Sequence, residues 1–475
     1  MTAEQYCRFE VTMDGPSSGN PYREVELFAD FRLAHRTVSV RGFYDGEGEY
    51  RLRFMPDEPG EWTWATRSNA QALDGRTGIM TVAPATAGNH GPVTVVGTRF
   101  AYADRTPYIP VGTTCYAWAH QDNAMRDETI ATLAAGPFTK IRMCVFPKHY
   151  RYNLNEPEHF VFPGSLDAGF DTDRFNPDFF SAFEADLDRL LDLGIEADLI
   201  LFHPYDRWGF QSLPQDVEER YLAYVVARLA SFRNVWWSMA NEWDFMKQKN
   251  EQDFHRYFRI VAREDPYAHP RGVHNGHTFY DHTLPWVTHA SIQRSDTERC
   301  AEWVSRYGKP VVIDECCYEG DIREGWGNIS ARELMRRQWT AVANGGWPGA
   351  HGETYYNEEE VLWWSKGRRL IGEAPARIAF MRRILEEAPV ERLSARRANW
   401  DLVCLNAGDD YMLYYLGFQR PSWKDLALPE GRTYTIDVID TWEMTVTPLD
   451  GTFSGEVRVP LPAKEYQAIR ASASA

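Results

Sequence analysis

The stretch VWWSMANEW, residues 235–243, ends a strongly apolar run with an asparagine and a glutamate, Asn241 and Glu242. A second stretch, KPVVIDE at residues 309–315, ends in a similar way at Glu315. Runs of this kind are typical of buried strands. A buried glutamate without a partner is costly, so one that directly follows such a run usually has a chemical task. Glu242 and Glu315 are therefore the candidate catalytic residues.

The same rhythm extends over the middle of the chain, from about residue 100 to residue 390. Short apolar runs alternate there with amphipathic stretches such as 178–193, in which Phe179, Phe183 and Leu187 recur at four-residue steps. Eight strand–helix units over roughly 290 residues are typical of a (β/α)8 barrel. A doubly wound sheet is the alternative, but the sequence has no Gly-rich phosphate turn after the first strand. Strands are expected at 108–114, 140–146, 196–202, 235–240, 272–274, 290–293, 310–314 and 343–347, and amphipathic helices at 178–193, 216–232, 251–264, 296–307 and 330–342.

Both ends of the chain show a different pattern, in which apolar and polar residues alternate in short runs broken by turn residues. The run YRLRFM at 50–55, for example, meets the turn residues PDEPG before EWTW resumes the alternation. Period-two runs with such punctuation are typical of small β-sandwiches. The sequence thus predicts an α/β protein of three domains: an all-β sandwich at 1–85, the catalytic barrel at 86–393 and a second all-β sandwich at 394–475.

The composition restricts the partners and the compartment. The formal net charge of −17 argues against a nucleic-acid or anionic-membrane partner, because phosphate groups attract basic surfaces. No apolar run reaches the roughly 18 residues that would span a bilayer. The first residues, MTAEQYCRFEVTMDG, lack the pattern of a signal peptide, and the seven cysteines show no paired spacing. We therefore expect a cytoplasmic protein with reduced thiols, whose flanking domains could mediate homo-oligomerisation.

Polar and aromatic residues gather where the expected strands end. Barrel enzymes build their sites at the carboxyl ends of the strands, so these residues are candidates for binding a substrate. Aromatic rings with a polar tip suit the CH-rich faces of sugars, and neutral histidines can hydrogen-bond to hydroxyl groups. The substrate-binding candidates are Asn241, Arg142, Trp118, His120, His149, His203, Tyr205, Asp206, Trp208, His274, His277, Gln293, Trp347, His351 and Glu353.

Two carboxyl groups at the ends of two strands suggest a specific reaction. When they flank a glycosidic bond at about 5–5.5 Å, they support double displacement with retention of configuration. One must then be protonated and the other ionised, which requires unequal surroundings. Trp243 would favour the neutral form of Glu242, and Arg142 would hold Glu315 as the anion. The alternative is that one of the two glutamates forms a salt bridge inside the barrel.

An apolar–Asn–Glu motif at the end of strand 4, with a glutamate ending strand 7, resembles the retaining glycoside hydrolases of clan A. The resemblance implies that Glu242 is the acid/base, that Glu315 is the nucleophile and that Asn241 donates to the sugar 2-hydroxyl. Arg142 and Trp347 fall where that clan keeps an arginine and an aromatic floor. Two departures are that Trp243 stands where proline is frequent and that Gln293 stands where a tyrosine often steadies the nucleophile.

The whole chain also resembles bacterial proteins that combine a barrel of the apiosidase-like type with a β-sandwich on either side. The motifs that carry this likeness are Phe54-Met55-Pro56, Gly60-Glu61-Trp62 and Pro110-Val111-Gly112-Thr113-Thr114. The resemblance implies a cofactor-free enzyme that acts on a small-molecule glycoside or oligosaccharide.

The sequence therefore predicts a retaining β-glycosidase without a metal or cofactor, and two alternatives stay open. One is a metal-dependent barrel hydrolase, although the expected first strand leads to Ala-Trp-Ala-His120-Gln and not to the His-x-His pair that such enzymes usually need. The other is a non-catalytic carbohydrate-binding protein on a glycosidase scaffold. The identity of the sugar, its linkage and exo or endo action stay undetermined.

Overall fold

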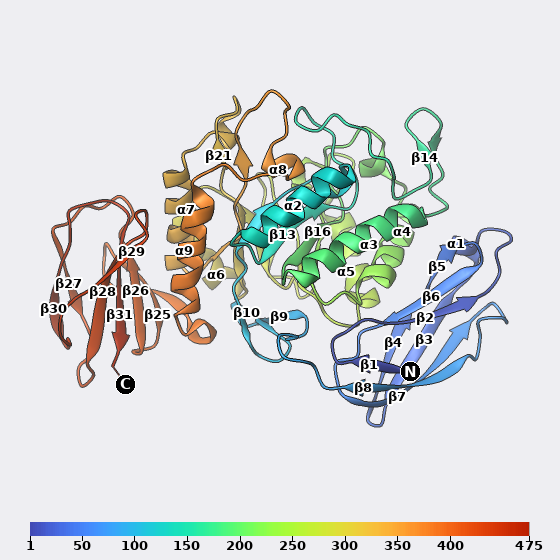
Figure 1. Cartoon of the computed structure of the whole chain (residues 1–475), viewed down its shortest axis with the longest axis horizontal. Coiled ribbons are helices and arrows are strands. Elements are labelled where there is room, and N and C mark those ends of the chain that lie inside the picture. Colours follow the sequence, from blue (N-terminus) through green and yellow to red (C-terminus); the bar gives the residue numbers. More distant parts are fainter. Residues whose placement is uncertain (475) are drawn as a thin grey trace.

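The computed structural model describes residues 1–474, and Figure 1 shows a central region of helices and parallel strands between two regions built from β-strands. The first β-strands of the chain and the last ones lie on opposite sides of this centre. The domain boundary predicted at residue 85 falls between β8 (Thr77–Ala83) and β9 (Val93–Val96). The boundary predicted at residue 393 directly precedes β24 (Ser394–Arg397). All three regions have their own clusters of buried apolar residues.

Among the described residues, eight parallel strands pair around the centre. The order β12-β13-β16-β17-β18 forms one sheet and β19-β20-β22 another. A parallel bridge from His274 to Ser291 connects β18 to β19, and one from Thr113 to His351 connects β22 back to β12. The pairing therefore returns to its first strand, and we call this arrangement the strand ring. Its members are β12 (Gly112–Thr114), β13 (Lys140–Cys144), β16 (Glu196–Ile200), β17 (Val235–Ser238), β18 (Arg271–Gly272), β19 (Ala290–Gln293), β20 (Val311–Glu315) and β22 (Trp347–Pro348).

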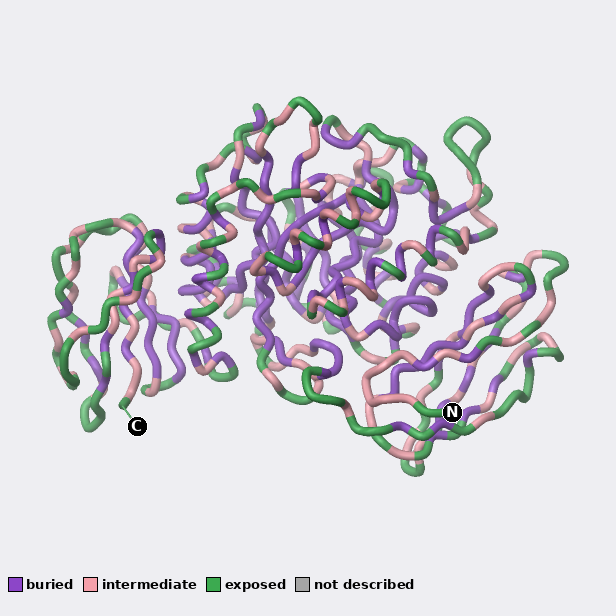
Figure 2. Tube along the Cα trace, viewed as in Figure 1, coloured by how far each residue is buried: buried purple, intermediate pink, exposed green. Residues whose placement is uncertain are grey.

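Among the described residues, helices follow seven of the eight ring strands, β18 being the exception, and their buried apolar residues pack around the ring. Figure 2 shows the buried residues gathered toward the centre of the molecule. In α3 (Pro177–Asp192), proline occupies the first turn and the Asn176 side chain accepts a hydrogen bond from the backbone of Asp178. Phe179 and Phe183 of this helix are buried, as their spacing predicts. No helix within residues 1–474 has the length and apolarity to cross a membrane. The other helices are α2 (Asn123–Ala135), α4 (Gln215–Leu229), α5 (Glu251–Glu264), α6 (Cys300–Tyr307), α7 (Ala331–Ala343), α8 (Trp363–Lys366) and α9 (Ala374–Glu386).

Three of the predicted elements depart most from their predicted bounds. The strand expected at 108–114 is divided, because Pro107–Tyr108 forms β11 beside β10 (Arg99–Tyr102) and only Gly112–Thr114 joins the ring. The strand expected at 343–347 begins only at Trp347, because α7 continues to Ala343 and Gly345 turns the chain with φ 80°. The helix expected at 296–307 starts with a 3₁₀ turn and becomes α-helical at Cys300.

The N-terminal region packs a five-stranded sheet on a three-stranded sheet. Phe31 of the first sheet stacks on Phe54 of the second with ring centroids 4.1 Å apart, within one buried apolar cluster. Arg53 binds both carboxylate oxygens of Glu184 on α3, which fixes this region to the centre. The strands are β1 (Thr2–Glu4), β8, β7 (Gly60–Ser68), β3 (Leu27–Leu33) and β4 (Arg36–Arg41) in one sheet, and β2 (Phe9–Asp14), β6 (Glu49–Phe54) and β5 (Phe43–Gly46) in the other.

The C-terminal region packs a six-stranded sheet on a two-stranded one. Met412 and Ile469 of the large sheet share a buried cluster with Leu426 and Val459 of the small one. The large sheet has the order β24, β25 (Val403–Ala407), β26 (Tyr411–Tyr415), β31 (Gln467–Ala473), β28 (Tyr434–Asp440) and β29 (Thr445–Pro448). The small sheet pairs β27 (Trp423–Ala427) with β30 (Glu456–Pro460), and the short elements of the chain are α1 (Pro21–Glu24), β14 (Gly164–Ser165), β15 (Gly169–Phe170), β21 (Glu319–Gly320) and β23 (Glu353–Thr354).

Candidate active site

Glu242 and Glu315 lie at the carboxyl ends of β17 and β20, with 7% and 4% of their surfaces exposed. Glu242 has left-handed backbone angles, φ 50° and ψ 56°, which are uncommon for a residue with a side chain. The backbone around it is held on both sides, because Asn241 N donates to Phe202 O at 3.0 Å and Trp243 N donates to His274 O at 3.0 Å. Strained angles of this kind cluster at functional sites, where the surrounding structure maintains them.

Two side chains connect the carboxylates through hydrogen bonds. Asn241 Nδ2 donates to Glu242 Oε2 at 3.1 Å, and the Tyr116 hydroxyl lies 3.0 Å from Asn241 Oδ1. The same hydroxyl lies within hydrogen-bonding distance of Glu315 Oε1, and since it has a single proton it donates either to Glu315 Oε1 or to Asn241 Oδ1. We call this arrangement, Glu242–Asn241–Tyr116–Glu315, the carboxylate bridge. It places the two acidic groups in one buried, hydrogen-bonded unit.

Further side chains donate hydrogen bonds to each carboxylate. The Tyr205 hydroxyl donates to Glu242 Oε2, and Gln293 Nε2 donates to Glu242 Oε1 at 3.3 Å. On the other side, Trp326 Nε1 donates to Glu315 Oε2 at 3.0 Å. Both glutamates are thus oriented by several neighbours, which is the geometry that precise catalysis requires.

Charged neighbours act on Glu315 in opposite directions. Burial and the nearby Glu242 raise the pKa of Glu315, whereas Arg142, the Tyr116 hydrogen bond and Lys148 lower it. Arg142 is fully buried, and its Nη1 lies 3.9 Å from Glu315 Oε1, as expected for a residue that stabilises the anion. The net shift is nevertheless upward, so Arg142 alone does not offset the burial. The Nε2 of His274 also lies 3.9 Å from Glu315 Oε1, and burial lowers the pKa of His274 so far that its imidazole is neutral.

The structure brings five of the predicted substrate-binding residues to the carboxylate pair: Asn241, Arg142, Tyr205, His274 and Gln293. Two other histidines make structural hydrogen bonds. His120 Nε2 lies 3.1 Å from Val145 O, and His203 Nε2 lies 3.1 Å from Phe146 O. In both histidines the other ring nitrogen, Nδ1, has no hydrogen-bond partner among residues 1–474, so the substrate-binding role of the two residues stays a prediction.

Three of the predicted residues stabilise the loop after β16. Asp206 accepts hydrogen bonds from the backbone of Trp208 and Gln211, both at 2.7 Å. Trp208 donates from Nε1 to Glu156 Oε1 at 2.8 Å, and His149 packs against its ring with centroids 5.9 Å apart. The polar side-chain atoms of Asp206 and Trp208 are therefore used within the loop, whereas His149 Nδ1 has no hydrogen-bond partner among residues 1–474. The substrate-binding role of these three residues stays a prediction.

Four more predicted residues lie in other surroundings. Trp118 is buried in the large apolar cluster, and His277 is exposed with its ring against Phe245. His351 Nδ1 lies 2.7 Å from Thr113 Oγ1, which ties β22 to β12. Glu353 accepts backbone hydrogen bonds at 371 and 372, at 2.8 and 3.0 Å. Each of these contacts serves the fold.

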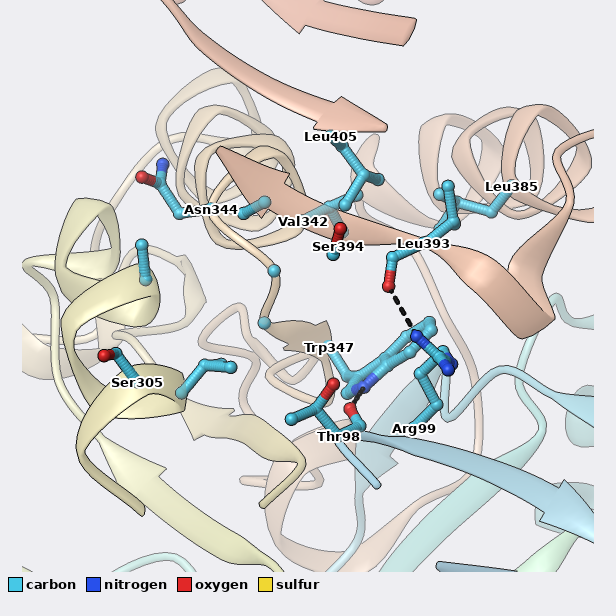
Figure 3. A pocket seen from close by; sticks show the side chains of 15 residues that line it. Thr98, Arg99, Ser305, Val342, Asn344, Trp347, Leu385, Leu393, Ser394 and Leu405 are labelled. Atoms are coloured by element: carbon cyan, nitrogen blue, oxygen red, sulfur yellow. Dashed lines mark hydrogen bonds between the residues drawn. The ribbon is translucent and has the colours of Figure 1, made fainter. Parts of the chain in front are cut away.

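Trp347 lies at the wrong end of its strand for the predicted aromatic floor. It begins β22 and pairs with Val312, three positions before Glu315. Its indole donates to Thr98 O at 3.4 Å and lines a cavity of about 300 Å³ beside the C-terminal region, with Leu393 and Leu405 on the opposite side (Figure 3). The physical reason is the later start of this strand, which moves Trp347 from the carboxyl end to the amino end.

The predicted site does not include three residues that the structure places at the pair: Tyr116, Trp326 and Lys148. Tyr116 extends the pairing of β12, because Cys144 N donates to its carbonyl at 2.9 Å, so it is the true end of strand 1. A strand estimate that began later and extended to residue 116 would have found it. Trp326 comes from a 3₁₀ turn eleven residues after Glu315, and no local pattern marks it. Within residues 1–474, no group of three or more His, Cys, Asp or Glu side chains is arranged to hold a metal ion.

The chain is similar to known proteins along its whole length. Residues 96–416 match the family model "Apiosidase-like, catalytic domain", and residues 2–69 and 400–472 match two domains of unknown function, DUF5060 and DUF5605. A solved "putative glycoside hydrolase" from Bacteroides vulgatus ATCC 8482 is 38% identical, with 100% of both chains covered and a TM-score of 0.95. A glycoside hydrolase family 5 protein from the same organism is 12% identical, covers 81% of this chain and 94% of its own, and has a TM-score of 0.64, a likeness of fold alone. No curated protein matches the chain.

Proposed function

We propose that this chain, which belongs to the apiosidase-like family, is a retaining glycoside hydrolase that cleaves a β-type glycosidic bond, or its equivalent in a furanoside, in a short oligosaccharide or glycoside. Glycosidase activity agrees with the family and with the glycoside hydrolases among its structural neighbours. The carboxylate bridge carries the mechanistic part of the proposal, because it holds two buried acids at the ends of two ring strands.

We infer the architecture of a (β/α)8 barrel at 86–393 between β-sandwiches at 1–85 and 394–475. The parallel pairing that runs through eight strands and back to β12 supports a closed barrel. In such barrels the carboxyl ends of the strands form the catalytic face, which agrees with the positions of Glu242 and Glu315.

The reaction proceeds in two steps. Glu315 attacks the anomeric carbon while the glycosidic C–O bond breaks and the Glu242 carboxyl protonates the leaving oxygen. Water then attacks the anomeric carbon of the glycosyl ester, giving its proton to Glu242 and releasing Glu315 as the carboxylate. Tyr116 and Trp326 donate to Glu315, which holds its oxygens in place for the attack.

Buried polar atoms beside the pair support a ligand rich in hydroxyl groups. Among residues 1–474, both ring nitrogens of His274 and the Oε1 of Gln293 lack a hydrogen-bond partner. Buried polar groups are seldom left unpaired, and sugar hydroxyls can both donate and accept. Asn241 can transfer its Nδ2 donor from Glu242 to the sugar 2-hydroxyl when substrate enters, as in the enzymes this site resembles.

The proposal is tested with a panel of aryl β-glycosides of pyranose and furanose sugars, with the first-formed anomer recorded by proton NMR. We expect turnover of at least one member, with retention of configuration and no loss of activity in the presence of a chelator. Inversion would contradict double displacement, and loss of activity with chelator would favour a metal-dependent hydrolase. Sugar binding without turnover across the panel would favour a non-catalytic carbohydrate-binding protein.

A further inference from the structure

Lys148 is a buried lysine at the carboxylate pair. It follows β13, and only 3% of its surface is exposed. Aromatic rings surround its ammonium: Nζ lies 3.5 Å from the ring centroid of Tyr116, 4.3 Å from that of Tyr205, 4.9 Å from that of Tyr150 and 5.8 Å from that of Trp364. A cation over an aromatic face is attracted by the ring quadrupole, and the attraction reaches about 2 kcal/mol or more away from water.

Two of these rings are the hydroxyl donors to the two carboxylates. Tyr116 bonds to Glu315 Oε1, and Tyr205 bonds to Glu242 Oε2. They come from different ring strands, Tyr116 beyond β12 and Tyr205 beyond β16. One ammonium therefore contacts the side chain that orients each member of the pair.

Keeping Lys148 charged in this buried position costs free energy. Burial lowers the pKa of Lys148, although Glu242 and Glu315 favour its charged form. A buried ion is often replaced by an apolar residue of similar volume without loss of stability, or even with a gain. A methionine would fill the same space among the four rings, so the fold alone does not require a cation here. Perturbed charges in a cluster of acids are characteristic of functional sites.

We propose that Lys148 is a positioning residue of the carboxylate pair: its ammonium fixes the rings of Tyr116 and Tyr205, and places a positive charge beside Glu242 and Glu315. This inference deepens the proposed function and rests on it for its catalytic consequence. Its effect on the pKa of Glu315 concerns the pair itself and can be measured without turnover.

The charge of Lys148 has a predictable effect on ionisation. Lys148 lowers the pKa of Glu315, so a neutral side chain in its place raises that pKa further. Glu315 attacks as the carboxylate, and the acid limb of the rate profile must therefore move to higher pH. The titratable and charged groups that face Glu315 or Lys148 are Glu242, Arg142, Cys144, Tyr116, Tyr205, Tyr150, Tyr318, His203 and His274, and the variant leaves all of them in place.

Trp326 offers a readout that does not depend on activity. Its Nε1 donates to Glu315 Oε2 at 3.0 Å, so we expect its fluorescence to respond to the ionisation of Glu315. The difference between a protein and its Trp326→Phe counterpart isolates this signal from the other tryptophans. The fluorescence of each protein is titrated against pH, and the titration of the same protein with Trp326→Phe is subtracted from it. We then compare the midpoint of the difference curve between the wild type and Lys148→Met. The exposed Lys464→Met serves as the matched control.

In Lys148→Met, we expect the midpoint and the acid limb of kcat/KM to rise together by about one pH unit. We also expect kcat to fall about 10-fold or more with KM nearly unchanged, and Lys464→Met to match the wild type. An unchanged midpoint in folded Lys148→Met would overturn the inference. If the midpoint shifts in Lys148→Met but the wild-type protein hydrolyses no glycoside, the inference about Lys148 is upheld and the proposed function is refuted. Should Lys148→Met fail to fold, Lys148→Arg keeps the charge and must retain the wild-type midpoint, and a changed midpoint there overturns the inference.

Discussion

The two ends of the strand ring differ in their surroundings although the same strands supply both, and buried ionisable groups such as Lys140 and Glu196 occur at the amino end as well. At the carboxyl end, Glu242, Glu315, Arg142 and Lys148 place charge in a buried setting. At the amino end, Trp347 lines an apolar cavity next to the C-terminal region. In barrel enzymes the catalytic residues lie at the carboxyl ends of the strands, whereas residues at the amino ends contribute to stability. The comparison teaches that the position of a residue along its strand decides its role more than its type does.

The largest expected effect comes from the carboxyl end. Glu315→Gln removes the nucleophile but keeps the size and one acceptor oxygen for Tyr116, so turnover should fall by at least about 10³-fold. The thermal midpoint should change little, because a neutral amide is cheaper to bury than a charge. Steady-state kinetics on the best aryl glycoside and a melting curve measure both quantities. Activity within about tenfold of the wild type would remove Glu315 from the mechanism.

A smaller loss is expected for Tyr116→Phe. The variant loses the hydroxyl that bonds to Glu315 and keeps the ring beneath Lys148. A hydrogen bond to a charged group is worth about 1.5–3 kcal/mol, so kcat should fall by roughly 10- to 100-fold. Tyr411→Phe is the matched control, since the Tyr411 hydroxyl lies on β26 in the C-terminal region and makes no hydrogen bond among residues 1–474. Equal losses in the two variants would show that the carboxylate bridge has no special role.

Tyr116 and Trp347 also show what the sequence can and cannot predict. Apolar runs that end in a glutamate identified β17 and β20, and both candidate acids lie at the ends of these strands in one hydrogen-bonded unit. Strands 1 and 8 were expected to begin too early: Tyr108 pairs with β10 and not with the ring, and Ala343, which suits a helix and a strand alike, ends α7. An error of a few residues moves a side chain from one end of the ring to the other. Donors from distant turns, such as Trp326, leave no local pattern at all.

At the amino end, Trp347→Ala should affect stability and leave catalysis unchanged. Removing a large buried ring costs about 3 kcal/mol, and the cavity beside it would grow. We expect a lower unfolding midpoint in urea and a kcat within about twofold of the wild type at a temperature where both proteins are folded. A large loss of kcat in the folded variant would place Trp347 at the sugar after all.

The smallest expected effect on catalysis concerns Glu196, the first residue of β16. Burial raises the pKa of Glu196 to about 8, and Trp236 Nε1 donates to its Oε2 at 3.0 Å. The folded protein therefore holds this proton above the pH at which the unfolded chain releases it, and stability falls between the unfolded pKa of about 4.5 and about 8. Glu196→Gln keeps the acceptor and removes the titration. It should equal the wild type near pH 4 and exceed it at pH 8.5 in urea unfolding; an identical pH dependence in both proteins would refute the assignment.

The most direct test of the two-carboxylate mechanism is the dependence of Glu242→Ala on the leaving group. An acid that protonates the leaving oxygen matters most when that oxygen is basic, so the variant should lose at least about 100-fold more kcat/KM on an alkyl glycoside than on a dinitrophenyl glycoside of the same sugar. Equal losses on the two substrates would contradict the role of Glu242 and, with it, the division of labour between Glu242 and Glu315.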